Sequence, residues 1–323
     1  MADAEPQVMQ CMEVWGGNQQ VDAGVVMAGL DAWVYSRPYE NASAGGDVYY
    51  VSSCATGRIT RLLVADVSGH GSGVSEIAMQ LRTLMRKYIN RIDQAKFVGS
   101  MNEHFTEMSS AGVFATAVVT TYFSPTRELR LCNAGHPPPV IWRASKKSWE
   151  FLWESEQRPS GNIPLGILEL EDYQQLDVRL EVGDLVLCYT DSLIECRGSD
   201  GQMLGTSGLI GIVRELDVSE PSSLIPRLLE RIQCQAQRNL SADDVTVMLF
   251  RANGLGATVP LRQKMLAPAR VMKSLVGSMM GKGPAGFPEL SVANVGGAIV
   301  GALSRVGKRK TQPGAVPHIS QER

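Results

Sequence analysis

The sequence lacks the patterns that mark several common functional classes. Its six cysteines include no Cys-x-x-Cys pair and no neighbouring histidines at the spacing of zinc ligands. No run of about 18 apolar residues, the length needed to span a bilayer, is present. These absences exclude a zinc-finger-like site and a membrane-spanning helix. Because the thiols have no evident partners, we expect them to be reduced and the protein to be cytoplasmic.

Charge is unevenly distributed along the 323 residues. The net charge is −2, but residues 253–323 hold ten Lys or Arg against two Glu, a charge of +8, which leaves −10 for residues 1–252. An acidic body of this kind is a poor nucleic-acid binder and is well suited to hold cations. We therefore predict no nucleic-acid partner.

An apolar strand that runs into a glycine turn stands at the centre of the sequence. Residues 58–65 read as this strand, and Asp66 follows it directly, before Ser68-Gly69-His70-Gly71. Other acidic residues have the same setting at a strand end or a glycine turn: Asp47 after Gly45-Gly46, Asp191 after residues 185–190, and Asp243-Asp244 before residues 245–250. Four acidic strand ends in one chain predict one acidic site.

Hydrophobic periodicity predicts roughly ten strands and two pairs of helices. The helical stretches are 74–90, 95–108, 207–215 and 221–238, and the strands are 24–37, 48–54, 58–65, 113–123, 128–133, 139–142, 149–153, 174–180, 185–189 and 245–251. Short turn-like separators predict that the three strands between 113 and 142 form an antiparallel meander. The expected fold class is α+β, with two mainly antiparallel sheets packed face to face and helices outside.

Clustered carboxylates are the ligands of hard cations, Mg²⁺ and Mn²⁺ above all. Several aspartates close together cannot all ionise in an empty site, so their convergence predicts bound cations and a site that is loose or partly protonated without them. Two metal ions about 4 Å apart can activate a water for attack on a phosphate ester. An EF-hand is excluded because its twelfth position is Ile77, and a Gly-x-Ser-x-Gly elbow is excluded because Asp66 lies two residues before Ser68.

The order of these motifs resembles that of the SpoIIE-like bacterial branch of the PPM metal-dependent serine/threonine phosphatases. The resemblance covers about residues 23–251. It is carried by Gly45-Gly46-Asp47, Ala65-Asp66-Val67-Ser68-Gly69-His70-Gly71, Asn133-Ala134-Gly135-His136-Pro137-Pro138, Pro164-Leu165-Gly166, Gly183-Asp184, Tyr189-Thr190-Asp191 and Ala242-Asp243-Asp244-Val245-Thr246. It implies a four-layer αββα sandwich with two Mn²⁺ or Mg²⁺ ions at one edge of the sheets.

The resemblance also implies a ligand set. Asp47 and Asp66 would hold the metal pair, with the Val67 carbonyl as a backbone ligand, and Asp191 and Asp243 would complete the shell of the second ion. Asp244 ranks second to Asp243, because relatives outside this branch often have Asn at that position. These are the residues that we expect at the catalytic and metal site.

Four positions depart from the family pattern or leave a role open. Ser192 follows Asp191 where Gly is usual, and Tyr50 stands where an acidic residue is common. Neither change removes a ligand, so we expect activity with altered metal affinity or loop position. Eukaryotic relatives have a histidine two residues after the central aspartate, whereas His70 lies four after Asp66, which argues against a general-acid role. For His136, before three prolines, we favour a structural role.

The implied domain organisation has three parts. Residues 1–22 are an N-terminal arm or an edge element, residues 23–252 are the phosphatase domain, and residues 253–323 are a basic tail rich in Gly, Ala and Met, mostly flexible. Residues 270–280 fit an amphipathic helix. For this segment a flexible linker, a membrane-surface anchor and a docking or autoinhibitory element are all open.

We hypothesise a phosphoprotein phosphatase that removes phosphate from Ser or Thr on a protein partner through a metal-activated water. The resemblance implies that the partner is a STAS-type anti-sigma-factor antagonist. One rival is a catalytically weak phosphatase-fold module that binds a phosphoprotein without turning it over. The other is an enzyme that hydrolyses a small-molecule phosphate.

Overall fold

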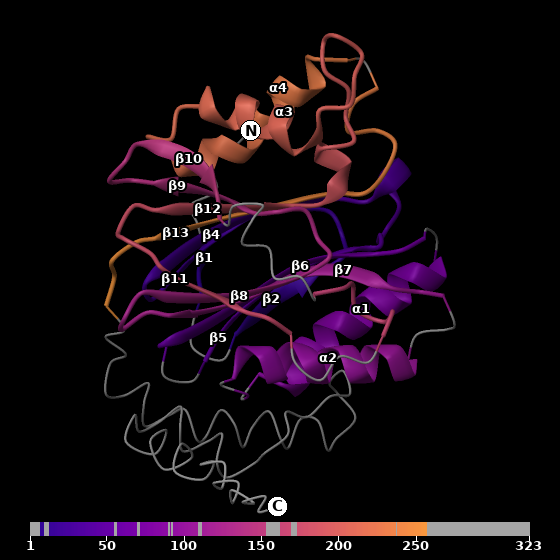
Figure 1. The fold of residues 1–323 in the computed structure, drawn as a ribbon, viewed down its shortest axis with the longest axis vertical. Coiled ribbons are helices and arrows are strands. Elements are labelled where there is room, and N and C mark those ends of the chain that lie inside the picture. The colour runs from indigo at the N-terminus through magenta and orange to yellow at the C-terminus, as the bar shows by residue number, and fades with distance from the viewer. Residues whose placement is uncertain are drawn as a thin grey trace, which may run out of the picture.

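Two β-sheets stack face to face, and a pair of helices covers the outer face of each (Figure 1). The computed structural model describes residues 7–9, 13–54, 57–69, 72–89, 91, 93–108, 112–152, 162–168, 173–236 and 238–256. The layers follow the order helices, sheet, sheet, helices, so the predicted αββα sandwich is confirmed. The candidate amphipathic helix at 270–280 lies outside the described residues.

The first sheet has seven strands in the order β1-β3-β4-β13-β12-β9-β10. Only the short β1–β3 pair is parallel, and every other pair in this sheet is antiparallel. Its strands are β1 Gln7–Val8, β3 Val21–Met27, β4 Leu30–Arg37, β9 Val140–Arg143, β10 Ser148–Phe151, β12 Leu185–Tyr189 and β13 Val245–Ala252. The outer face is covered by α3 Gly205–Arg214 and α4 Leu224–Gln233 (Figure 1).

The second sheet has six strands in the order β11-β8-β7-β6-β5-β2 and is antiparallel throughout. Its strands are β2 Val14–Gly17, β5 Asp47–Ser53, β6 Ile59–Val67, β7 Ala115–Phe123, β8 Glu128–Ala134 and β11 Leu176–Arg179. Its outer face is covered by α1 Ser72–Lys87 and α2 Gln94–Met108 (Figure 1). No helix in the described part of the chain is long and apolar enough to cross a membrane.

Alternation along the strands divides the apolar side chains among three buried layers. In β6, Val64 faces the core between the sheets, whereas Leu63 and Ala65 face α1 and α2. In β12, Cys188 faces the core between the sheets and Leu187 faces α3 and α4. Because successive side chains of a strand point to opposite faces, these apolar residues also determine where the polar residues at the strand ends point.

The predicted meander is wrong for its third strand. β7 and β8 pair as expected, but β9 pairs with β10 and β12 in the other sheet. The segment between β8 and β9 therefore crosses from one sheet to the other. Pro137 and Pro138 have no N–H to give to a ladder, and the N–H of His136 donates to Asn133 Oδ1 at 2.7 Å. The backbone here cannot continue the second sheet.

Residues that we expected to form an N-terminal arm take part in both sheets. β2 pairs with β5 along the edge of the second sheet, and β3, which begins at Val21, pairs with β4 in the first. The alternative of an edge element describes residues 14–17 better than a loose arm does. The connection between β2 and β3 thereby comes to lie beside the Gly45-Gly46-Asp47 turn, where the N–H of Gly45 donates to the Asn18 carbonyl at 2.9 Å.

Candidate metal centre

Asp47 and Asp66 lie directly opposite each other on neighbouring strands. Asp47 is the first residue of β5, and its register partner across the ladder is Asp66, next to last in β6. Directly opposed residues have their Cβ atoms roughly 4.5–5.5 Å apart and share one face of the sheet. By alternation from Val64, that face is the one between the two sheets. The carboxylates therefore terminate the inter-sheet core at one end of the sandwich.

Hydroxyl groups of the first sheet reach the same place. Thr190, just after β12, donates from Oγ1 to Asp47 Oδ2 at 2.9 Å, and its Oγ1 accepts from the N–H of Thr246 at 3.0 Å. Thr246 is joined in turn to Ser36 of β4, with 2.9 Å between their hydroxyl oxygens. This chain of hydrogen bonds ties Asp47 to three strands of the facing sheet.

The roles of Thr190 and Ser36 were not predicted from the sequence. Both lie at inward-facing strand positions, two residues beyond the core residues Cys188 and Val34. A hydroxyl at an inward position after an apolar run was the signal available in the sequence.

Asp191 begins a short 3₁₀ helix, Asp191–Leu193, immediately after Thr190. Burial raises the pKa of its carboxyl group, and the nearby charges of Glu195 and Asp243 raise it further. Glu195 was not among the predicted site residues. Its N–H donates to the Asp191 carbonyl at 2.9 Å, so one helical turn brings it back toward the site. The i, i+4 spacing was the signal that could have found it.

The pKa of the Asp66 carboxyl group responds to burial and to the charges of its acidic neighbours. Burial raises its pKa, and the charges of Asp191, Asp243, Asp244 and Glu195 raise it further, to about 7. The pKa of Asp47 is also raised well above its usual value, first by burial and then by the charges of Asp66 and Asp244. The structure thus brings every predicted carboxylate into one electrostatic group, and a bound cation would relieve its repulsion.

Asp244 has a different environment from the other carboxylates. Its Oδ1 accepts from the N–H of Tyr39 at 2.6 Å, and its Oδ2 accepts from the N–H groups of Gly46 at 2.6 Å and Asp47 at 3.3 Å. Asp243 Oδ1 accepts from the N–H of Asp244 at 2.8 Å. Oδ2 of Asp244 therefore fixes the turn that presents Asp47, and Oδ1 holds the backbone at Tyr39.

The carbonyl of Val67 lies beside the same turn. A Cβ atom on Gly46 would approach the Val67 carbonyl oxygen to 3.0 Å, and the Val67 N–H donates to the Gly46 carbonyl at 3.3 Å. The absence of a side chain at Gly46 lets β6 and the turn come this close. The Val67 carbonyl oxygen therefore lies beside the Gly45-Gly46-Asp47 turn, and its role as a backbone ligand stays a prediction.

The donor set fits a hard divalent cation. It offers the carboxylates of Asp47, Asp66, Asp191 and Asp243 and one backbone carbonyl, with no soft ligand among them. Within the described ranges, no three Asp, Glu, His or Cys side chains converge tightly enough to form a ready-made metal cluster. The pKa values of Asp47, Asp66 and Asp191 are raised first by burial and then by neighbouring carboxylate charges. A loose, partly protonated site without metal stays a prediction.

His136 is buried, and its ring Nδ1 is 2.8 Å from the hydroxyl oxygen of Thr116, the register partner of Asp66. Burial lowers its pKa to about 3, so the ring is neutral. The side-chain amide of Asn133 also donates to the His136 carbonyl at 2.9 Å. These contacts describe a residue that fixes the crossover between the sheets. His70 lies outside the described residues.

The departures from the family pattern have different consequences. Tyr50 is fully buried against α1 and α2, on the face of β5 opposite to Asp47. Ser192 is buried beside the site, with its hydroxyl oxygen 3.3 Å from that of Thr190. Only the change at Ser192 touches the hydrogen bonds that hold Asp47.

Asp184, the aspartate of the Gly183-Asp184 motif, has a structural role. It precedes β12, whereas Asp191 follows that strand, so the two lie at opposite ends of the sandwich. Its carboxylate accepts from Arg143 Nη1 at 3.0 Å, from the N–H of Ala144 at 2.9 Å and from the N–H of Glu181 at 3.0 Å. Asp184 therefore joins the turns next to β10 and β12.

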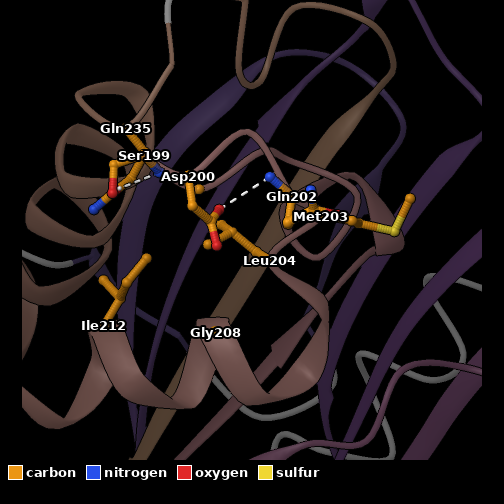
Figure 2. Close-up of a pocket in the computed structure, with 9 residues that line it drawn as sticks. Ser199, Asp200, Gln202, Met203, Leu204, Gly208, Ile212 and Gln235 are labelled. Atoms are coloured by element: carbon orange, nitrogen blue, oxygen red, sulfur yellow. Dashed lines mark hydrogen bonds between the residues drawn. The ribbon is translucent and has the colours of Figure 1, made fainter.

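A surface pocket is formed by the loop that follows Asp191 and Glu195 in the chain, and it is separate from the carboxylates. It is lined by Gly198, Ser199, Asp200, Gln202, Met203 and Leu204 of the loop after Glu195, by Gly208 and Ile212 of α3, and by Gln235 (Figure 2). The loop is held by hydrogen bonds from the Ser199 N–H to Gln235 Oε1 and from the Gln202 N–H to Asp200 Oδ1. None of the predicted metal ligands lines it.

The αββα fold and the carboxylates at one end of the sandwich define a PPM-type phosphatase domain. A family model described as Stage II sporulation protein E (SpoIIE) matches residues 56–253, more than half of the chain. The protein belongs to this family.

Two curated proteins from Bacillus subtilis (strain 168) are similar to the chain. It is 24% identical over 223 residues to the phosphoserine phosphatase RsbU, covering 69% of this chain and 63% of RsbU. It is 23% identical over 218 residues to the phosphoserine phosphatase RsbP, covering 65% of this chain and 50% of RsbP. The chain thus spans half to somewhat under two thirds of the length of these relatives.

Among solved structures, that of the RsbU and RsbW domains of Rv1364c from Mycobacterium tuberculosis superposes with a TM-score of 0.58 at 25% identity. The match covers 80% of this chain and 72% of that one. It supports the same fold over most of the described residues.

The packing at Gly45 leads to a testable prediction. A Cβ atom there would lie 2.6 Å from Asp244 Cγ, so Gly45→Ala displaces the carboxylate that holds Gly46 and Asp47. We expect a loss of about 2 kcal/mol in the free energy of unfolding, measured in urea, from weakened hydrogen bonds to a charged group.

The matched control is Gly211→Ala in α3, where a Cβ atom meets nothing within 4 Å. That variant should be unchanged or more stable by up to about 1 kcal/mol, because alanine is the better helix former. Equal effects of the two substitutions would contradict the role assigned to the Gly45 packing.

Proposed function

We propose that this protein is a metal-dependent phosphoprotein phosphatase that hydrolyses phosphoserine or phosphothreonine on a protein partner. The observation that carries the proposal is the register of Asp47 opposite Asp66, with Asp191 close enough to raise the pKa of Asp66 to about 7. Carboxylates arranged in this way need a cation to ionise together. Membership of the SpoIIE family supports a phosphatase, and the likeness to two phosphoserine phosphatases supports the substrate class.

Asp47, Asp66, Asp191 and Asp243, with the Val67 carbonyl, would hold two Mn²⁺ or Mg²⁺ ions. When bound, such ions lower the pKa of a water and stabilise the charge that develops on the phosphoryl group. The protein's own contribution is positioning. Thr190 fixes one oxygen of Asp47, and Asp244 fixes the backbone of the turn before it. We assign Asp244 to this positioning role and Asp243 to the metal.

We further propose that the partner is a STAS-type regulator, as the family resemblance implies, and that the protein acts in the cytoplasm. The five cysteines among the described residues are free thiols, which fits a reducing compartment. The role of the tail stays a prediction: contact with a membrane surface or with a regulator.

The test is phosphate release with and without Mn²⁺ from a phosphoserine peptide, a phosphorylated STAS domain and a sugar phosphate. We expect metal-dependent release from the phosphoprotein and the peptide and little from the sugar phosphate. Asp191→Asn should reduce release by about 10²-fold, the scale on which removal of one electrostatic stabiliser acts.

Stable binding of the phosphorylated STAS domain without release would instead support the binding module. Preference for the sugar phosphate would support the small-molecule enzyme.

A further inference from the structure

Asn18 holds the turn that carries Asp47 at Gly45, whereas Asp244 holds it at Gly46 and Asp47. It lies between β2 and β3 and is only 2% exposed. Its carbonyl accepts from the Gly45 N–H at 2.9 Å, and its Nδ2 donates to the Gly45 carbonyl at 2.8 Å. One residue thus holds both polar groups of Gly45, two residues before Asp47.

The same side chain reaches the beginning of α1. Its Nδ2 also lies within hydrogen-bond distance of Ser75, 3.0 Å from the carbonyl oxygen and 2.9 Å from Oγ. An amide nitrogen has two hydrogens, so the Gly45 carbonyl takes one of them and the two oxygens of Ser75 share the other. Asn18 therefore joins the β2–β3 connection, the Gly45-Gly46-Asp47 turn and the first turn of α1.

Two other residues also restrain Asp47 and its turn. Asp244 holds the N–H groups of Gly46 and Asp47, and Thr190 holds the carboxylate. These hydrogen bonds of Asp244 and Thr190 do not connect the turn to α1. In the described part of the chain, the side-chain hydrogen bonds of Asn18 join Gly45 to α1.

We propose that Asn18 is a positioning residue for the metal centre, which fixes Gly45 against α1 and thereby sets the place of the Asp47 carboxylate. The proposal rests on the proposed function for the identity of the ligand, a divalent cation. Residues that orient metal ligands without touching the metal typically contribute 10- to 100-fold to metal affinity. Asn18 would act in this way by holding the backbone of Gly45, since it makes no direct hydrogen bond to the Asp47 carboxylate.

The test is Mn²⁺ binding by isothermal titration calorimetry on the full chain, without substrate, for Asn18→Ala and Asn18→Ser. We expect Asn18→Ala to weaken Mn²⁺ binding about 10- to 100-fold, and Asn18→Ser, which keeps a small donor, to weaken it less. The matched control is Asn253→Ala. Nδ2 of Asn253 donates to the Met27 carbonyl at 3.0 Å and to Asp31 Oδ1 at 2.7 Å, at the opposite end of the sandwich.

Asn253→Ala should lower thermal stability and leave Mn²⁺ affinity within about twofold of wild type, since it loses comparable hydrogen bonds far from the carboxylates. If folded Asn18→Ala binds Mn²⁺ as tightly as Asn253→Ala, the proposal is overturned. If Asn18→Ala does not fold, wild-type affinity in folded Asn18→Ser overturns it equally. A wild type that binds Mn²⁺ but releases no phosphate overturns the proposed function and leaves the role of Asn18 intact.

Discussion

Asp66→Ala is expected to abolish Mn²⁺-dependent release of phosphate from an aryl phosphate, with a loss of at least about 10³-fold. Asp66 stands at the centre of the acidic group. After burial, the charges of four neighbours raise the pKa of its carboxyl group: Asp191, Asp243, Asp244 and Glu195. Removing it takes away the carboxylate opposite Asp47 that would help to hold the metal pair. Initial rates at several Mn²⁺ concentrations measure the loss, and calorimetry should show weakened Mn²⁺ binding in parallel.

Asp177→Ala provides the matched control for this variant. Asp177 lies on β11 of the same sheet, and its side chain is half exposed, 3.9 Å from Arg130 Nε. This variant should retain the wild-type rate and metal affinity. Turnover by Asp66→Ala within about tenfold of wild type would remove Asp66 from the metal site and, with it, the mechanism proposed above.

The metal-free protein is expected to lose stability as the pH rises from about 4 to about 7. The Asp66 carboxyl has a pKa of about 7 in the folded protein, against the usual 3.8. Between these values the unfolded chain has released the proton that the folded protein still holds, so raising the pH favours unfolding. At about 1.36 kcal/mol for each pH unit, the contribution amounts to at most about 4 kcal/mol. Above pH 7 this contribution to the free energy of unfolding is fully lost, and a further rise in pH changes it no more.

Urea unfolding in EDTA at half-unit pH steps, for the wild type and Asp66→Asn, isolates this contribution. Asn cannot ionise, so the variant should be the more stable protein near pH 7, and the difference should vanish near pH 4. Millimolar Mn²⁺ should reverse the trend for the wild type, because metal binding requires ionised carboxylates and stabilises the folded state. A wild type that gains stability relative to Asp66→Asn between pH 4 and pH 7 in EDTA would contradict the assigned pKa shift.

The fold class followed from sequence because periodicity reports which face of each element is buried. Largely apolar runs next to turn residues identified strands at 58–65 and 185–189, and three- and four-residue spacing in residues 74–90 identified a helix, all near their observed bounds. Periodicity does not report which sheet a strand joins. For this reason the meander prediction was wrong at β9, where two prolines and the hydrogen bond from His136 take the chain across to the other sheet.

The carboxylates were identifiable because Asp at a strand end beside glycine is a local pattern. Their supporting residues were not, because each contact spans a long separation in sequence. Thr190 meets Asp47 across 143 residues, and Asp244 meets Gly46 across 198. Asn18 lies in a segment with no periodicity at all, and its contacts to Gly45 and Ser75 exist only once both sheets and α1 are packed.

The sequence by itself determined the two antiparallel sheets with helices outside, the acidic character of residues 1–252 and the acidic strand ends, since each is written in local pattern or composition. The four-layer order and the ligand set were implied by the family resemblance. Only the tertiary structure decided that Asp47 opposes Asp66 and that Asp244 supports a turn. The physical reason is that register and packing are collective. A carboxylate acquires its pKa, and a hydroxyl its partner, only from neighbours that folding brings together.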